Sequence, residues 1–270
     1  MTSRTAIDEE LIDPSITRAR RRRNTILVSR IVLIAALVVA WEAASPLFNH
    51  LVFSSPSEIA SKLWEWTLDG TLARNLFVTL QEIVFGYIAG ASIAIVLGLL
   101  LGSYPTAAAI LDPILMAIYG VPKIAFGPLF IVWFGISLTP KVVICGLTVF
   151  FFIFYSTYEG ARNADRDLLR TVRLMGATKF QERMLVIVPG ALPAILLGLK
   201  LAIPEALVGA IVGELIVSSR GIGYLIEYSA TQLESAGMFA GLLLLMTMAV
   251  IFNSAVSFAT GTARRHRDDE

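Results

Sequence analysis

Long apolar runs separated by short polar segments dominate the pattern of this 270-residue chain. A run of about twenty predominantly apolar residues is long enough to cross the hydrocarbon core of a bilayer as a helix. Six such runs lie at about 26–47, 76–102, 107–136, 142–158, 192–217 and 238–259. The pattern therefore predicts an all-α, polytopic membrane protein with six transmembrane helices.

The one long polar interruption, residues 165–193, contains a helical pattern of its own. Leu168, Val172 and Met175 recur at i, i+4 and i+7, so they share one face of a helix. Gly176 follows, and glycine often ends a helix because it adopts the left-handed C′ conformation without a Cβ penalty. We expect a short amphipathic helix that stops at Gly176.

A second short helix is predicted directly after this glycine. Thr178 followed by Gln181 has the spacing of a capping box, in which each side chain bonds the other residue's backbone N–H. Pro189 and Pro193 come next. We expect the chain to turn back into the membrane at these prolines.

Positive charge gathers on one predicted side of the membrane. The segment 1–24 is polar and ends in an arginine cluster, the loop 160–188 is rich in arginine, and more arginines lie in 263–270. Six spans place all three segments on the same side, which the positive-inside rule identifies as the cytoplasm, whereas five spans would place one basic terminus outside. The predicted organisation is a disordered cytoplasmic tail (1–24), a transmembrane domain (25–262) and a second cytoplasmic tail (263–270).

An amphipathic helix is predicted between the first and second runs. Ser55, Pro56 and Glu58 provide an N-cap, a first-turn proline and a capping-box acid. Trp64 and Trp66 follow, and tryptophan prefers the membrane–water boundary. The helix either lies along the outer surface of the membrane or belongs to an extracytoplasmic loop.

Small residues recur every four positions along the second run. They are Gly86, Gly90, Ala94, Gly98 and Gly102. Helices in lipid lack a hydrophobic drive toward each other, and small residues permit the close backbone approach that holds them together. The ladder indicates a buried helix–helix contact, either within one subunit or with a second copy of the chain.

Composition narrows the classes of function. With 56% hydrophobic and 16% charged residues, the chain is too apolar for a soluble domain. The net charge of +1 gives no indication of nucleic-acid binding. The single cysteine, Cys145, lies in an apolar run, and His50 and His266 lie in flanking segments. No histidine-based metal or catalytic cluster is therefore expected.

The sequence also lacks a site for ATP. No Gly-x-x-x-x-Gly-Lys-Ser/Thr motif occurs in it, and that motif supplies the backbone N–H groups and the lysine that hold nucleotide phosphates. No cofactor is expected in this chain. If ATP and Mg²⁺ drive its function, they bind in another chain.

Lys123 lies near the middle of the third run, where a charge is costly and usually faces a cavity or a partner. Pro122 precedes it and frees a backbone carbonyl, so the helix can break there. Broken helices at membrane depth line cavities or are buried in protein. We expect Lys123 to lie on the route of an anionic solute or, alternatively, to neutralise Glu82 or Glu205.

Two acidic residues lie in the fifth run. Glu205 falls near its middle and Glu214 nearer its outer end. At about 100° per residue their spacing puts them on opposite faces of an ideal helix, so a shared proton relay is not expected unless Pro204 kinks the helix. We expect Glu205 to line a translocation path or pair with a lysine, and Glu214 to form an outer-end gate or a structural contact. In the alternative interpretation, both bond neighbouring helices.

The helix–glycine–helix–proline segment resembles the cytoplasmic coupling loop of binding-protein-dependent ABC importer permeases. That loop reads Glu-Ala-Ala, three residues, Gly, nine residues, Ile, one residue, Leu-Pro. The glycine, the proline and their spacing match here, but Arg170-Thr171-Val172 replaces Glu-Ala-Ala. The residues to which the resemblance assigns contact with an ATPase subunit are Arg170, Arg173, Leu174, Met175, Gly176, Ala177, Thr178, Phe180 and Pro189.

Two further segments, at 121–135 and 213–226, resemble the nitrate/sulfonate/taurine branch of these permeases. They read VPKIAFGPLF with WFG, and GE with SSRGIGYLI. The resemblance covers about 55–259 and implies a type I ABC importer permease fold in the plasma membrane of a prokaryote, with both termini cytoplasmic. It also implies a homodimeric pore, two cytoplasmic ATP-binding subunits and an extracytoplasmic solute-binding protein. Sulfonate, nitrate, bicarbonate and a pyrimidine vitamin precursor all remain open as the solute.

Two other classes of function compete with this interpretation. A polytopic membrane enzyme would have to rely on carboxylates such as Glu82, Glu205 and Glu214. An ion-driven secondary transporter would show internal repeats, which the sequence lacks, and would leave the 165–193 pattern unexplained. A transport subunit without a catalytic site is the favoured prediction.

Overall fold

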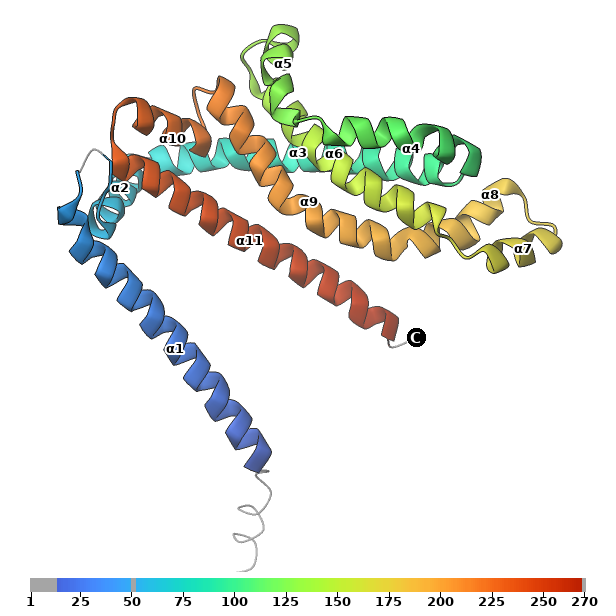
Figure 1. Cartoon of the computed structure of the whole chain (residues 1–270), viewed down its shortest axis with the longest axis horizontal. Coiled ribbons are helices and arrows are strands. Elements are labelled where there is room, and N and C mark those ends of the chain that lie inside the picture. Colours follow the sequence, from blue (N-terminus) through green and yellow to red (C-terminus); the bar gives the residue numbers. More distant parts are fainter. Residues whose placement is uncertain (1–13, 50–51, 269–270) are drawn as a thin grey trace, which may run out of the picture.

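The computed structural model describes residues 14–49 and 52–268, and every regular element in these ranges is a helix (Figure 1). The α-helices are α1 (Pro14–Ala44), α2 (Pro56–Leu68), α3 (Thr71–Gly102), α4 (Pro105–Gly120), α5 (Gly127–Phe134), α6 (Leu138–Arg162), α7 (Arg166–Leu174), α8 (Lys179–Glu182), α9 (Val188–Val217), α10 (Ile222–Thr231) and α11 (Ser235–Asp268). Two 3-10 helices, η1 (Ser45–Leu47) and η2 (Lys123–Phe126), and a π-helical turn (Arg183–Ile187) complete the set. The all-α prediction is confirmed.

Five helical stretches in the described ranges are long and apolar enough to cross a membrane. They lie at 28–47, 71–102, 138–162, 179–216 and 235–254. The predicted third span, 107–136, is not one helix, because it divides into α4, η2 and α5. The six predicted spans therefore correspond to five long helices and one interrupted segment, with the interruption at the predicted Pro122.

Proline and glycine account for the break. Val121 is extended (φ −72°, ψ 129°), because the ring of the following Pro122 disfavours the α conformation. Gly135 ends α5 with a φ of +72°, in the left-handed region that favours glycine. The predicted break of the third span at Pro122 is confirmed.

The broken segment nevertheless returns the chain along the length of its neighbours. Gly86 of α3 lies against Cys145 of α6, and Gly102 lies against Tyr158, so α3 and α6 run in the same direction. Two parallel helices need a connection that crosses back between them. Residues 105–134 provide it.

Helix α6 lies between α3 and an antiparallel α9. Gly198 of α9 lies against Ser156, and Gly213 lies against Lys141, so residue numbers rise along α9 as they fall along α6. Helices α2 and α10 and the start of α11 lie near one end of this three-helix centre, whereas α7 and α8 lie at the other end (Figure 1). Helix α1 extends away from the centre, and few of its side chains are buried.

The small-residue ladder of α3 lies at its contact with α6. Ala94 is fully buried. A Cβ atom on Gly86 would lie 2.6 Å from the Cys145 sulfur, and one on Gly98 would lie 2.8 Å from the Thr157 Cβ. Packing within one subunit therefore accounts for the ladder.

We expect Gly90→Leu to destabilise the subunit by about 1–3 kcal/mol, the usual cost of overpacking a close-packed contact. The added side chain would meet the Gly146 backbone of α6, which cannot rotate away. The free energy of unfolding in detergent measures the effect. Gly190→Leu is the matched control, because a Cβ there meets nothing within 4 Å; equal destabilisation by the two substitutions would contradict the prediction.

The amino-terminal tail is partly helical. Helix α1 begins at Pro14, so the disorder expected for residues 1–24 is wrong for 14–24. The arginines there favour helix, and proline is well tolerated in a first helical turn. Residues 1–13, 50–51 and 269–270 lie outside the described residues.

Helix α2 begins with the predicted capping box. The Glu58 N–H donates to the Ser55 hydroxyl (3.2 Å), and the Ser55 N–H donates to the Glu58 carboxylate (3.0 Å). Trp66 is buried and Trp64 is exposed. One face of α2 therefore packs on the protein and the other remains open.

Candidate functional site

Residues 165–189 form a helical hairpin at one end of the molecule (Figure 1). The Asp165 carboxylate starts α7 by accepting hydrogen bonds from two backbone N–H groups of the first turn, at 2.8 and 3.1 Å. Gly176 has a φ of +87°, and the following Ala177 N–H returns to the Val172 oxygen (3.0 Å). The predicted glycine stop is confirmed.

The second arm of the hairpin continues into the membrane-length part of the chain. The predicted capping box is present: Thr178 N–H donates to the Gln181 side chain (2.8 Å), and Gln181 N–H donates to the Thr178 hydroxyl (3.3 Å). Helix α8 then passes through the π-helical turn into α9. The expected turn at Pro189 and Pro193 is wrong, because the chain enters α9 without leaving the helical path.

The π-helical turn explains how proline is tolerated there. Proline has no N–H, and its ring clashes with the carbonyl four residues earlier. A π turn pairs residues five apart and widens the helix, and it lies immediately before Pro189. The hairpin is therefore joined directly to α9 rather than hinged at the proline.

A buried carboxylate holds the two arms together. Arg173 of α7 donates to Glu182 of α8 (2.9 Å), and Lys179 lies 3.6 Å from the same carboxylate. The hydrogen bond and charge of Glu182 raise the pKa of Arg173 above its usual value. Arg170, in contrast, pairs only with the exposed Asp167 (3.2 Å), and such a surface pair contributes little.

The tip of the hairpin exposes large apolar side chains. Leu174 is 90% exposed, Met175 is 82% exposed, and Phe180 is also exposed. Contiguous exposed apolar residues mark interaction surfaces. Thr178 is exposed and Ala177 is half-buried beside this tip, whereas Pro189 is exposed at the start of α9, away from the tip.

A buried polar cluster joins α3, α6 and α9 at the opposite end. Glu82 of α3 is fully buried and forms an ion pair with the buried Lys141 of α6. The Lys141 ammonium also donates to the Ser218 hydroxyl (3.0 Å), at the end of α9. Charges inside a membrane-spanning segment are stable only when paired or solvated, and here each charge has the other as its partner.

Glu214 belongs to the same cluster and organises the loop that follows α9. Its carboxylate accepts hydrogen bonds from the Thr79 hydroxyl (2.6 Å) and the Gly223 N–H (2.6 Å). The Gly221 N–H donates to the Asn75 side chain (2.7 Å). These contacts tie the loop to α3, so Glu214 has the surroundings of a structural contact.

Lys123 lies in the break between α4 and α5. Its ammonium donates to the backbone carbonyl oxygen of Tyr119 (2.6 Å) and lies 4.6 Å from the Tyr119 ring and 5.2 Å from the Phe151 ring. Glu82 is occupied by Lys141, which overturns the alternative that Lys123 neutralises Glu82. No ion pair joins Lys123 to Glu205 within the described residues.

Glu205 lies half-buried in α9. No hydrogen bond or ion pair of its side chain occurs among residues 14–49 and 52–268, so the expected pairing with a lysine is not found there. Glu214, nine residues along the same helix, is fully buried. The two carboxylates therefore lie in different environments, as the helix geometry predicts.

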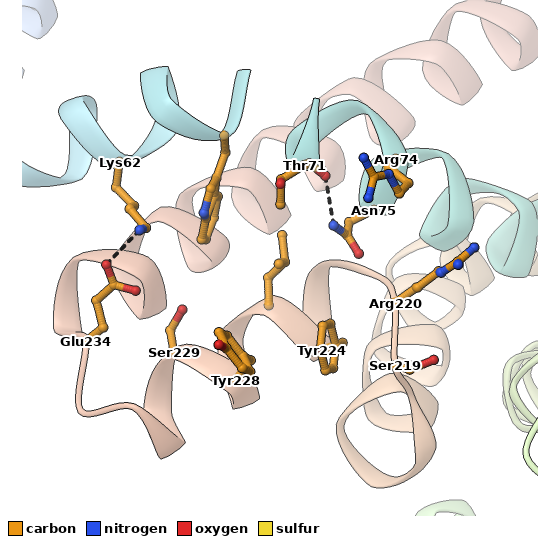
Figure 2. A pocket seen from close by; sticks show the side chains of 12 residues that line it. Lys62, Thr71, Arg74, Asn75, Ser219, Arg220, Tyr224, Tyr228, Ser229 and Glu234 are labelled. Atoms are coloured by element: carbon orange, nitrogen blue, oxygen red, sulfur yellow. Dashed lines mark hydrogen bonds and ion pairs between the residues drawn. The ribbon is translucent and has the colours of Figure 1, made fainter. Parts of the chain in front are cut away.

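An open polar pocket of about 350 Å³ lies beside the buried cluster (Figure 2). On one side of it Lys62 of α2 bonds Glu234 (2.8 Å). Arg74 of α3 and Arg220 of the loop after α9 line the other side. Neither arginine side chain has a hydrogen-bond or ion-pair partner in the part of the chain described. The pocket therefore carries excess positive charge that favours anions.

Sequence reasoning missed part of this site. Lys141 directly precedes the predicted fourth span, 142–158, and the apolar pattern did not single it out as the partner of Glu82. Asn75 and Thr79 precede or begin the predicted second span, which in fact starts at Thr71. Glu82 was the indication in the sequence, because a carboxylate in an apolar run usually pairs with a cation. A search for that cation would have included Lys141.

The comparisons agree on a family and a fold. Residues 73–262 match the family described as binding-protein-dependent transport system inner membrane component. A putative aliphatic sulfonates transport permease protein, SsuC, of Bacillus subtilis is 31% identical over 84% of this chain and 83% of its own. The taurine transport system permease protein TauC of Escherichia coli is 30% identical over 81% and 82%.

Two further comparisons bear on specificity and on fold. The formylaminopyrimidine transport permease protein ThiX of Halalkalibacterium halodurans is 33% identical over 82% of this chain and 88% of its own. A solved structure of the MetNI methionine ABC transporter in an inward-facing conformation aligns with a TM-score of 0.57 at 19% identity. That alignment covers 73% of this chain and 96% of the solved one, and at this identity it shows the fold alone.

Proposed function

Because the chain belongs to the family of binding-protein-dependent transport system inner membrane components, we propose that it forms the translocation path for a small anionic solute of the sulfonate class. Membership makes it the permease subunit of an ABC importer, a multi-pass inner-membrane protein that is not itself an enzyme. It works with an ATPase and a solute-binding protein. ATP and Mg²⁺ are proposed to bind in the ATPase chain.

This family identity replaces the two alternatives raised from the sequence. A membrane enzyme would carry its own catalytic site, whereas members of this family are transport subunits. A secondary transporter would draw on an ion gradient, whereas an ABC importer depends on a separate ATPase. The acidic residues Glu82 and Glu214 are instead occupied by structural contacts.

The positive charge of the pocket in Figure 2 supports an anionic solute, whereas the substrates named for similar permeases differ from one another. The names of similar permeases refer to sulfonates, taurine and a formylaminopyrimidine, so names alone leave the class open. The observation that carries the proposal is the excess positive charge of Arg74 and Arg220 in the outer pocket (Figure 2). Lys123, in the break between α4 and α5, provides a further cation.

The proposed assembly contains two copies of this chain, two ATPase subunits and one solute-binding protein. Glu205 supports a second copy, because a half-buried carboxylate in a membrane-length helix needs a polar partner or a water-filled path. The exposed apolar tip of the hairpin supports ATPase contact on the cytoplasmic side. The arginine-rich hairpin and termini support a cytoplasmic location for both ends.

Transport in reconstituted vesicles tests the function. The permease, its ATPase and its solute-binding protein are incorporated into vesicles, and uptake of taurine, an alkanesulfonate and a neutral amide of matched size is compared. We expect ATP-dependent uptake of the sulfonates and none of the amide. Uptake of the amide alone would refute an anionic solute while leaving the permease assignment intact.

Lys123→Met should lower sulfonate uptake at least about tenfold, because a hydrogen bond to a charged group contributes about 1.5–3 kcal/mol. The basal ATPase rate of the complex should remain. Lys123→Arg is the control, because it keeps the charge beside the Tyr119 and Phe151 rings and should retain most of the uptake. Unchanged uptake by the methionine variant would remove Lys123 from the solute route.

Gly176→Val should reduce the amount of solute moved per ATP hydrolysed without preventing membrane insertion. A Cβ at Gly176 meets nothing within 4 Å, so the cost arises from the φ of +87°, which disfavours non-glycine residues by about 1–2 kcal/mol. Gly176→Asn is the matched control, since asparagine tolerates positive φ better. Equal coupling ratios in the valine variant and the wild type would argue against the role of this turn.

A further inference from the structure

A large basic pocket lies beside the cytoplasmic hairpin, at the end of the molecule opposite the pocket of Figure 2. Its volume is about 790 Å³, and it lies between the end of α3, the start of α4, the end of α6 and the arms of the hairpin. Six basic and two acidic side chains line it. The pocket lies apart from Lys123 and from the apolar tip at Leu174, Met175 and Phe180, although Arg170 and Arg173 of the predicted coupling set line it.

The two acidic groups of the pocket are already occupied. Asp112 accepts hydrogen bonds from the Tyr158 hydroxyl (2.6 Å) and the Arg162 guanidinium (2.9 Å). Glu182 is held by Arg173 (2.9 Å) and Lys179 (3.6 Å). Neither carboxylate is therefore available to neutralise the remaining cations.

Two arginines of the pocket lack an acidic partner. Arg166 forms no hydrogen bond or ion pair with its side chain in the described ranges. Arg183 donates to the Tyr104 hydroxyl and lies 4.6 Å from the Tyr104 ring, which orients the guanidinium without neutralising it. Arginine presents a planar set of donors that matches phosphate oxygens.

The pocket lies where three membrane-length helical stretches end, as expected for a site near lipid headgroups. The membrane-length stretch of α3 ends at Gly102, that of α6 ends at Arg162, and that of α8–α9 begins at Lys179. All three residues line the pocket. Tyr104 adds an aromatic side chain of the kind that gathers at the membrane–water boundary.

A second cavity, lined by Pro113, Leu115 and two tyrosines as well as by Asp112, Glu159 and Arg162, leads from the pocket toward the membrane interior. This cavity of about 360 Å³ shares Asp112 and Arg162 with the pocket and continues past Leu115 and Tyr155. Tyr155 precedes Arg162 on α6 by two helical turns, roughly 10 Å deeper at about 1.5 Å per residue. A molecule with a phosphate at one end and acyl chains at the other fits both cavities.

We propose that this pocket binds the phosphate of an anionic phospholipid, with Arg166 and Arg183 as its principal ligands. Basic pockets between transmembrane helices on the cytoplasmic side recognise such headgroups. Bound there, the lipid would fill the space between the hairpin and the helix ends and so brace the hairpin against the membrane.

Lipid selectivity of the assembled transporter tests the proposal. The complex of permease and ATPase is placed in phosphatidylcholine nanodiscs with a small fraction of phosphatidylglycerol, and protein-bound lipid is counted by native mass spectrometry. Each arginine removed should lower the preference for phosphatidylglycerol about fivefold, the effect of one basic residue near an anionic surface. We therefore expect a marked loss in the double variant Arg166→Gln/Arg183→Gln.

Two control variants keep the result interpretable. Arg30→Gln removes an exposed arginine of α1 outside the pocket, and it should leave the preference unchanged. Arg183→Lys keeps the positive charge and should restore much of the preference lost in Arg183→Gln. The proposal fails if the double variant retains the full preference, or if Arg30→Gln lowers it as much as Arg183→Gln does.

Two further measurements separate other occupants of the pocket. Inorganic phosphate, which lacks acyl chains, should displace phosphatidylglycerol only at concentrations far above those at which the lipid saturates the site. Displacement at comparable concentrations would assign the pocket to a soluble phosphate compound and overturn the lipid assignment. Loss of the ATPase subunit from the double variant, with its lipid preference intact, would make the pocket part of the ATPase interface instead.

Discussion

Lys141→Met is expected to destabilise the folded permease by about 3–5 kcal/mol, the usual result of breaking a buried ion pair by removing one partner. Glu82 would remain fully buried beside an apolar side chain. The Ser218 hydroxyl would also lose its ammonium donor. The substitution would leave the Glu82 carboxylate, whose side chain is fully buried, without its cation.

The free energy of unfolding in detergent, followed by tryptophan fluorescence, measures this effect. Lys200→Met is the matched control, because Lys200 is an exposed lysine of α9 with no ion-pair partner in the described part of the chain. Adding Glu82→Gln to Lys141→Met should restore part of the lost stability by removing the orphaned charge. Equal stability of Lys141→Met and Lys200→Met would show that the pair contributes nothing.

Leu174→Asp is expected to weaken binding of the ATPase subunit at least about thirtyfold. Complete burial of a leucine contributes roughly 1.5–3 kcal/mol, and an interface that closes over the tip would also have to bury a carboxylate. The side chain is 90% exposed in the subunit alone. Its replacement should therefore leave folding intact and act only in the complex.

Affinity for the purified ATPase subunit, measured in detergent or nanodiscs, tests the prediction. Leu68→Asp is a suitable control, because Leu68 is an exposed leucine at the opposite end of the molecule. It should leave ATPase binding unchanged. If Leu174→Asp binds the ATPase as tightly as wild type, the apolar tip is not the contact surface, and the paired charges of Arg173 and Glu182 become the next candidates.

Features that depend on a few consecutive residues, such as helix ends and breaks, were predicted well from the sequence. The capping boxes at Ser55 and Thr178 and the positive φ of Gly176 depend on a few consecutive residues, so the sequence contains all the information they need. The break at Pro122 was likewise predictable from one residue's chemistry. The continuity of α8 with α9 was not, because tolerance of Pro189 depends on a π-helical turn that no short motif announces.

Long-range pairings were harder to predict. Glu82 and Lys141 are adjacent only because α3 and α6 run parallel in close contact. The sequence supplied the small residues that make this contact possible, but not the identity of the partner helix. Lys141 was overlooked for that reason, and the role of Asn75 in holding the loop after α9 was missed for the same one.

The close contact of α3, α6 and α9 also determines where permeation is impossible. At Gly90 the backbone of α3 touches the backbone of α6, and at Gly160 α6 lies directly against α9. A passage for solute cannot run between the helices at these two contacts, because even one added methyl group would clash there. We therefore expect the translocation path of the importer to run along another face of this helix group.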